Sequence, residues 1–158
     1  MNDALAEFDD AIASVVAEHP DAQIFASFPG VGPILTAVLL AEIGEDRSRY
    51  PSVQALLAES GLAPVTRSSG RSHSVRFRYA ANARLREAAM WWAFNSLKTS
   101  PWAAAAFRQA RDERGQRYHR ALRGLAARWM RVAWRCWQDG ATYEPARHMA
   151  AVIAEATG

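Results

Sequence analysis

The chain has 158 residues, of which 50% are apolar and 22% charged, so it can bury the core of one compact domain with or without an appendage. Its formal net charge is +3, and its single cysteine, Cys136, excludes an internal disulfide framework and a multi-cysteine zinc site. The N-terminus has no basic stretch followed by an apolar run, and no apolar stretch reaches membrane-spanning length. These features predict a cytoplasmic protein without membrane contact.

The charged residues are unevenly distributed. Residues 1–62 carry ten acidic and two basic side chains, whereas residues 63–138 carry three acidic and sixteen basic ones. Residues 139–158 carry three acidic and one basic side chain. A basic centre between acidic ends is typical of a protein that binds a polyanion.

The first predicted helix covers residues 2–18, where apolar residues recur at spacings of three, four and three. This pattern is the seam of a coiled coil or of a helical hairpin. Pro20 ends the helix, because the residue before a proline is disfavoured in helical conformation. We therefore expect residues 1–20 to be the end of a coiled coil or connecting helix, and residues 21–158 to form a helical domain. The seam residues are Leu5, Phe8, Ile12 and Val15.

Residues 21–44 have the pattern of a helix-hairpin-helix. Asp21 is placed to cap a short helix, and Gly30 and Gly32 permit a tight reversal before Pro33 opens the next helix. Such a hairpin points unpaired backbone N–H groups at a phosphate without reading sequence. However, Ile34 follows the proline where DNA-binding hairpins usually have a polar residue. The sequence leaves open whether Gly30 and Gly32 contact nucleic acid or form a purely structural turn.

A basic, serine-containing loop is predicted after a short helix over residues 51–61. Ser68 and Ser69 directly precede Gly70 in this loop. A serine hydroxyl surrounded by guanidinium groups suits phosphoryl transfer, because the planar guanidinium fork fits two phosphate oxygens. The alternative is a basic surface loop that only touches phosphates. The arginines of this segment are Arg67, Arg71, Arg76, Arg78, Arg84 and Arg86.

Four further helices are predicted over residues 82–97, 100–114, 117–138 and 144–156. The first is apolar nearly all round, which is typical of a buried helix and places both Trp91 and Trp92 in the core. The third has a face of arginines with no acidic residue between Glu113 and Asp139 to pair with them, which favours polyanion contact. These arginines are Arg117, Arg120, Arg128, Arg131 and Arg135.

These elements predict an all-α fold, in which the helix-hairpin-helix is followed by a helical bundle with a basic serine-containing loop. No His, Cys, Asp or Glu set has metal-ligand spacing, and no glycine-rich nucleotide loop is present. Acidic residues occur as neighbours in sequence, which point apart on a helix. We therefore expect no metal and no cofactor in this chain.

In its order of motifs the chain resembles the C-terminal half of a family of bacterial insertion-sequence transposases. These are RNA-guided recombinases with an N-terminal RuvC-like domain and a C-terminal serine domain. The resemblance covers nearly the whole chain, although Ala81 stands where the family usually has glycine. It is carried by residues 28–33, 39–44, 61–64 and 139–145, by Ser69-Gly70, and by Asn82 with Leu85-Arg86.

The resemblance implies a domain whose serine attacks a DNA phosphate during transposition and recombination. By position the nucleophile is Ser69, with Ser68 as the alternative, and Arg67, Arg71, Arg84 and Arg86 are the candidate phosphate clamp. The implied partners are DNA, a guide RNA, and either a second copy or a RuvC-like domain. A divalent metal is implied only for the RuvC-like domain.

This chain has no RuvC-like half, so we expect a truncation, a remnant or a cut fragment that binds DNA but recombines little on its own. Two readings compete with the transposase domain. One is a non-enzymatic helix-hairpin-helix module that binds nucleic acid through Gly30 and Gly32. The other is an interaction fragment that dimerises through the apolar seam of residues 5–15.

Overall fold

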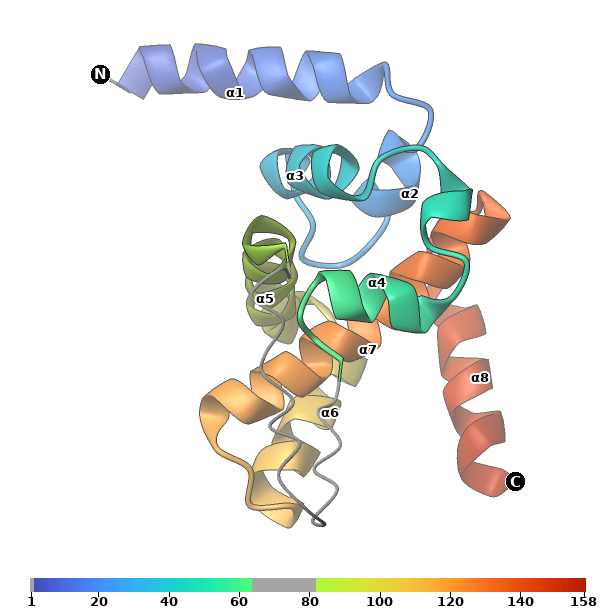
Figure 1. Cartoon of the computed structure of the whole chain (residues 1–158). Helices are drawn as coiled ribbons and strands as arrows, with labels where there is room; N and C mark the ends of the chain where they lie inside the picture. Colours follow the sequence, from blue (N-terminus) through green and yellow to red (C-terminus); the bar gives the residue numbers. More distant parts are fainter. Residues whose placement is uncertain (1, 64–81) are drawn as a thin grey trace, which may run out of the picture.

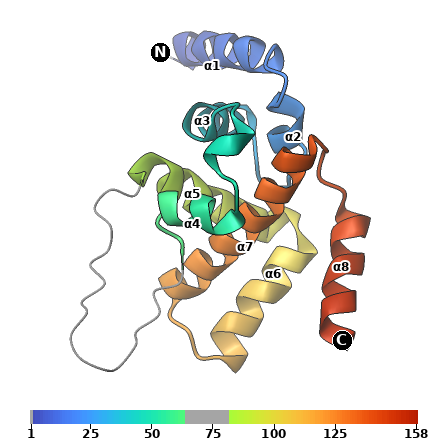
Figure 2. The ribbon, with the colours of Figure 1, turned by 45° about the vertical axis from the view of Figure 1, so that its right-hand side comes forward.

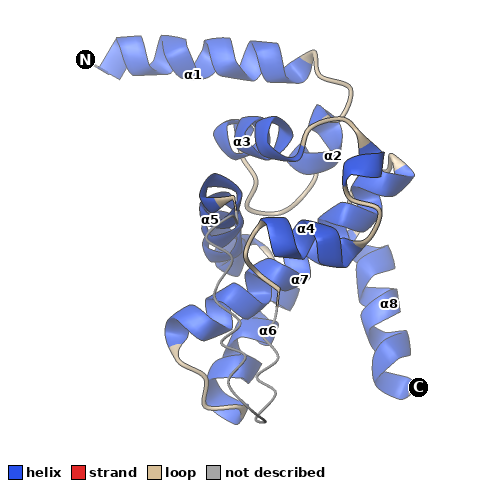
Figure 3. Cartoon of the chain, in the orientation of Figure 1, coloured by secondary structure: helices blue, strands red, loops and turns tan. Residues whose placement is uncertain are grey.

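The computed structural model describes residues 2–63 and 82–158, and these ranges are helical, without a strand (Figure 3). The all-α prediction is confirmed. A 3-10 turn, η1 (Arg47–Arg49), and a π-helical turn, η2 (Gln109–Glu113), interrupt the α-helices of the described ranges. Those helices are α1 (Asn2–Ala17), α2 (Ala22–Ala26), α3 (Pro33–Ile43), α4 (Val53–Glu59), α5 (Ala83–Thr99), α6 (Pro101–Arg108), α7 (Tyr118–Asp139) and α8 (Pro145–Thr157).

Helix α7 is the central element of the bundle, with α2, α4, α5 and α6 packed around it (Figures 1 and 2). Its inner face is apolar, and Trp129 at its middle is fully buried. The Trp129 ring stacks on Trp92 of α5 with centroids 5.4 Å apart, and its indole N–H donates to the Ser96 hydroxyl at 2.8 Å. Because a buried indole N–H needs an acceptor, this hydrogen bond fixes how α5 and α7 pack.

Helix α5 is less buried than its sequence predicts. Leu85, Trp92 and Ser96 face the core, but Trp91 is 58% exposed. The prediction that Trp91 belongs to the core is therefore wrong. One residue corresponds to about 100° around a helix, and α5 packs mainly against α3, α6 and α7. These neighbours do not cover the side that carries Trp91.

Helix α1 extends beyond the body of the domain (Figure 1). The predicted helix is present, and it packs on α3 and the nearby α2. Its apolar seam nevertheless stays largely uncovered in the described structure, since Leu5, Phe8 and Val15 are 61%, 65% and 72% exposed.

A partly buried ion pair joins the start of α2 to η1. Both carboxylate oxygens of Asp21 accept N–H groups of Arg47, at 2.5 and 2.7 Å. The Arg47 Nε–H also donates to the Trp137 carbonyl at 3.0 Å, which ties the pair to α7. The hydrogen bonds from Arg47 lower the pKa of Asp21. Asp21 does precede α2, but its side chain does not cap the helix as predicted, because Arg47 occupies both of its oxygens.

Candidate nucleic-acid interface

Gly30 in the hairpin turn is required by the fold. Its φ of +82° lies in the region that favours glycine, and a Cβ there would lie 2.7 Å from the Ser96 backbone nitrogen on α5. Two side chains of α5 hold the turn: the Trp92 indole N–H donates to the Pro29 carbonyl at 3.0 Å, and the Asn95 amide donates to the Gly30 carbonyl at 3.3 Å. The turn is therefore docked on α5 through Gly30.

Gly32 is different, and the prediction that it permits the reversal is wrong. Its φ of −88° and ψ of −176° are extended values that any residue adopts. Apart from its two chain neighbours, no described residue has an atom within 4 Å of a Cβ built at Gly32. Its carbonyl accepts both the N–H and the hydroxyl of Thr36 at 2.9 Å, which starts α3. Gly32 lies on the exposed side of the turn beside Ile34, which is 46% exposed.

Most of the predicted serine loop lies outside the described residues. The two ends of the segment are described, and they meet, because the Asn82 N–H donates to the Glu59 carbonyl at 2.6 Å. Asn82 also caps α5, since its Oδ1 accepts the Leu85 N–H at 3.1 Å, and its amide donates to Glu42 at 2.7 Å. Asn82 thus fixes where the segment joins α5. The site residues outside the described ranges are Ser68, Ser69, Arg67, Arg71, Arg76 and Arg78.

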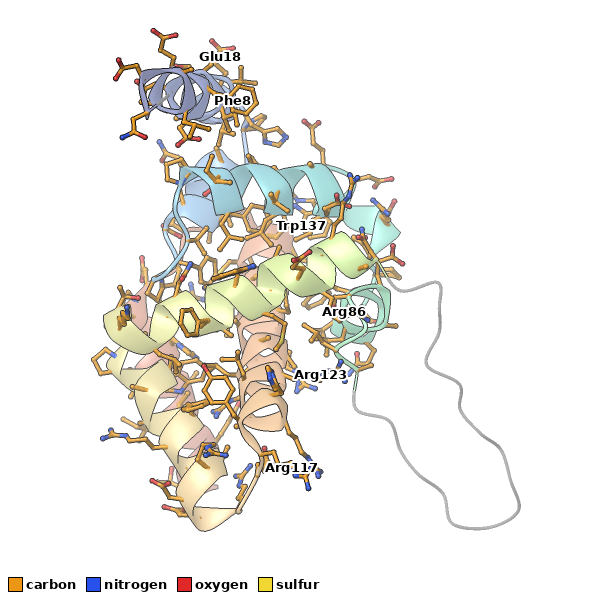
Figure 4. The ribbon with its side chains drawn as sticks, turned by 90° about the vertical axis from the view of Figure 1, so that its left-hand side faces the viewer. Phe8, Glu18, Arg86, Arg117, Arg123 and Trp137 are labelled. Atoms are coloured by element: carbon orange, nitrogen blue, oxygen red, sulfur yellow. The ribbon has the colours of Figure 1, made fainter. Side chains whose placement is uncertain are left out.

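Close to this junction a hollow of about 680 Å³ lies between α5 and the start of α7. We call it the α5–α7 hollow. Arg86 enters it from α5, one turn after Asn82. Figure 4 shows Arg86 and Arg123 on the same side of the domain, below the N-terminal end of α5. The residues that line the α5–α7 hollow are Ala83, Arg86, Glu87, Met90, His119, Arg120 and Arg123.

Arg84 does not join this cluster. It lines a separate, more apolar hollow between α3 and α5, together with Ile34, Trp91 and others. Two residues along a helix are separated by about 200° around its axis, so Arg84 and Arg86 leave α5 in nearly opposite directions. The structure therefore separates Arg84 and Arg86, which the sequence grouped in one phosphate clamp, and it brings Arg86 together with Arg120.

The second half of the arginine face borders a groove of about 560 Å³ between α7 and α8, which we call the α7–α8 groove. Arg128, Arg131 and Arg135 line it from α7, and Arg147 lines it from α8. The Arg128 guanidinium lies 4.7 Å from the centre of the Trp102 ring, an arrangement that orients the side chain. Burial, followed by repulsion from Arg114, lowers the pKa of Arg128.

One arginine of the face is paired, contrary to the sequence-based expectation. The Arg135 Nε–H lies 3.0 Å from Asp139, four residues further along α7. The pair is exposed, so it contributes little to stability, but it partly neutralises the C-terminal end of the face. Arg120, Arg128 and Arg131 form no ion pair within the described part of the chain.

Helix α8 contacts the body through His148. The Tyr143 hydroxyl and His148 Nδ1 are 2.8 Å apart, and the His148 ring packs edge-on against Trp102 with centroids 4.5 Å apart. Burial, and then repulsion from Arg128, lower the pKa of His148. The ring is therefore neutral at pH 7. No side chain of α8 is fully buried, and His148 and Val152 are its half-buried residues.

Among the basic side chains that line the α5–α7 hollow and the α7–α8 groove, sequence reasoning missed His119, Arg123 and Arg147. The spacing of Arg120 and Arg123 places them one turn apart on α7. That spacing could have suggested a pair, but their partner Arg86 is distant in sequence. Among residues 2–63 and 82–158, no group of three metal-ligating side chains is found, and no helix is long and apolar enough to cross a membrane.

An all-helical domain with two arginine-lined depressions along one central helix has the features of a polyanion-binding protein. Comparison with known sequences is more specific. The chain belongs to the transposase IS116/IS110/IS902 family, whose sequence model matches residues 22–108.

The relatives of the chain come from bacterial insertion elements. A mini-circle protein assigned as transposase for IS117 from Streptomyces coelicolor is 41% identical over 143 residues, which are 90% of this chain and 34% of the relative. An uncharacterised 42 kDa protein of insertion element IS900 from Mycobacterium paratuberculosis is 34% identical over 96% of this chain and 38% of the relative. An uncharacterised 43.6 kDa protein of IS110 from S. coelicolor is 33% identical over 84% of this chain and 33% of the relative. The chain thus spans little more than a third of the length of these relatives.

Proposed function

We propose that this chain is the DNA-binding and strand-exchange domain of an insertion-sequence transposase. Membership of the transposase family supports a role in transposition. The observation that carries the proposal of DNA binding and strand exchange is the α5–α7 hollow, which is lined by both Arg86 and Arg120. Arg86 lies one helical turn after Asn82, where the serine-containing segment joins α5. Two guanidinium groups in one hollow suit a phosphate.

The chemistry proposed for the serine segment is a transesterification at a DNA phosphate. The Ser69 hydroxyl oxygen forms a bond to phosphorus, and one bond between phosphorus and a deoxyribose oxygen breaks. The serine proton is lost to a base, and the leaving oxygen takes up a proton. Reversal with a different strand end restores the serine. Arg86 and Arg120 would stabilise the negative charge that develops on the phosphate oxygens.

The partners follow from this reaction. DNA occupies the arginine-lined hollows, and a guide RNA, as a second polyanion, meets the same basic face. A RuvC-like domain, on the same polypeptide or on another, supplies the divalent metal. In this proposal the domain acts in the cytoplasm as part of a homo-oligomer, and it exchanges strands only together with the RuvC-like domain.

The alternative, a helix-hairpin-helix module without enzymatic activity, fits the contacts less well. The turn faces α5 through Gly30, and Ile34 rather than a cation follows on its exposed side. A hairpin that binds phosphate needs free N–H groups and a favourable charge nearby. Only Gly32 and the start of α3 remain available for that contact.

The test supplies a RuvC-like domain, fused or as a separate chain, with a divalent metal and the nucleic acids of the element. We expect a covalent protein–DNA adduct that survives denaturant and disappears on proteolysis. Ser69→Ala should abolish it and leave non-covalent binding intact, whereas Ser68→Ala should only weaken it. An adduct that persists in a variant lacking both serines would refute the assignment to Ser69 and Ser68.

A further inference from the structure

Gly124 lies in the interior of α7, where glycine destabilises a helix relative to alanine. It is exposed, and it is absent from the glycines of the described chain that have positive φ. Apart from its chain neighbours and the backbone of α7 itself, no described atom lies within 4 Å of a Cβ built at this position. Neither backbone conformation nor packing against the described residues accounts for this glycine.

The position of Gly124 on the helix is informative. It lies four residues after Arg120 and four before Arg128, and with about 3.6 residues per turn all three fall on one face. Arg120 lines the α5–α7 hollow and Arg128 lines the α7–α8 groove. Gly124 is therefore the point at which α7 separates two arginine-lined depressions.

We propose that a DNA backbone crosses α7 at Gly124 and passes from the α5–α7 hollow to the α7–α8 groove. This inference rests on the proposed function, in which DNA is the polyanion. Without a Cβ at Gly124, sugar and phosphate atoms approach the helix more closely, which brings them within reach of the arginines on either side. The eight residue steps from Arg120 to Arg128 span about 12 Å of helix, comparable with three to four base-pair steps of about 3.4 Å.

The charges around the groove indicate where the backbone lies. Trp102 holds the Arg128 guanidinium in place, so less conformational freedom is lost when it binds a phosphate. On the α8 side, the groove also carries Glu155 and, directly before α8, Glu144, which repel a phosphate. On the α7 wall, the lining acid Asp139 is paired with Arg135. The backbone is therefore expected to follow the α7 wall, along Arg128 and Arg131.

The test uses the opposite effects that alanine should have on stability and on binding. Gly124→Ala should raise the melting temperature, because alanine favours the helix. The same change should weaken binding of a labelled duplex DNA of about 25 base pairs severalfold, and Gly124→Leu should weaken it more than tenfold. The matched control is Ala105→Leu, an added side chain at an exposed position of α6, which should leave affinity unchanged.

Each other outcome is decisive. A lower melting temperature for Gly124→Ala would show that the glycine serves the fold, and unchanged affinity in both variants would show that nothing approaches it. If the Gly124 variants lose affinity for a structured RNA but not for duplex DNA, the occupant of this path is RNA and the proposal of DNA is refuted. If the parent does not bind DNA at all, the proposed function fails as well. If the parent binds and loses affinity in Arg86→Ala but not in Gly124→Leu, only the crossing at Gly124 is refuted.

Discussion

The hairpin turn and the arginine face of α7 both suit a phosphate on sequence grounds, but their surroundings differ. Gly30 in the turn packs closely against the α5 backbone. The side chains of Trp92 and Asn95 donate hydrogen bonds to the carbonyls of Pro29 and Gly30, respectively. On α7, by contrast, Arg120 and Arg128 border depressions of several hundred cubic ångströms. A Cβ built at the exposed Gly124 between them meets no described atom within 4 Å, apart from its chain neighbours and the backbone of α7 itself. A glycine that the fold requires is a weak indication of a ligand, whereas a glycine that the fold does not require is a stronger one.

The largest expected effect separates the two glycines of the turn. Gly30→Ala should cost about 3–5 kcal/mol of unfolding free energy, since the new Cβ meets backbone at 2.7 Å and φ is unfavourable. Gly32→Ala should change it by less than about 0.5 kcal/mol, because extended backbone accepts alanine. Denaturant unfolding of the two variants measures the difference, and equal losses would mean that the turn is not docked as described.

The next effect compares a partly buried with an exposed ion pair. Asp21→Ala leaves the Arg47 charge without its partner and should cost about 2–4 kcal/mol. Arg135→Ala removes an exposed pair and should cost less than about 0.5 kcal/mol. Thermal melting of both variants at the same ionic strength tests the contrast. A small loss in Asp21→Ala would contradict its role in joining α2, η1 and α7.

The smallest effect concerns the attachment of α8. Because the pKa of His148 is lowered in the folded state, the unfolded chain binds more protons. His148 therefore supports folding above its unfolded value of about 6.5, and this support is lost as the pH falls through that value towards the lower folded pKa. The parent should lose stability between pH 7.5 and 5, and His148→Gln should lose less over that range. Identical pH profiles would show that His148 is not buried as described.

The sequence predicted the helices well because their periodicity and end signals are local. The start of α5 near residue 82 and the start of α3 at Pro33 were both readable from residues a few positions apart. The convergence of Arg86 with Arg120 was not, because it depends on how α5 packs on α7. The exposure of Trp91 and the pairing of Asp21 with Arg47 depend on tertiary packing in the same way. The prediction for the serines themselves concerns residues outside the described ranges.

The central claim is that the arginines of α5 and α7 bind the DNA backbone. The most direct test is the salt dependence of duplex DNA binding in a double variant, Arg86→Ala with Arg120→Ala. If each arginine neutralises one phosphate, the slope of log K against log salt should become shallower by about 0.9 per arginine. Lys98→Ala with Arg108→Ala is the control, since both residues are exposed and line neither the α5–α7 hollow nor the α7–α8 groove. The account predicts an altered slope in the first pair only; the same slope change in both pairs, or in neither, would contradict it.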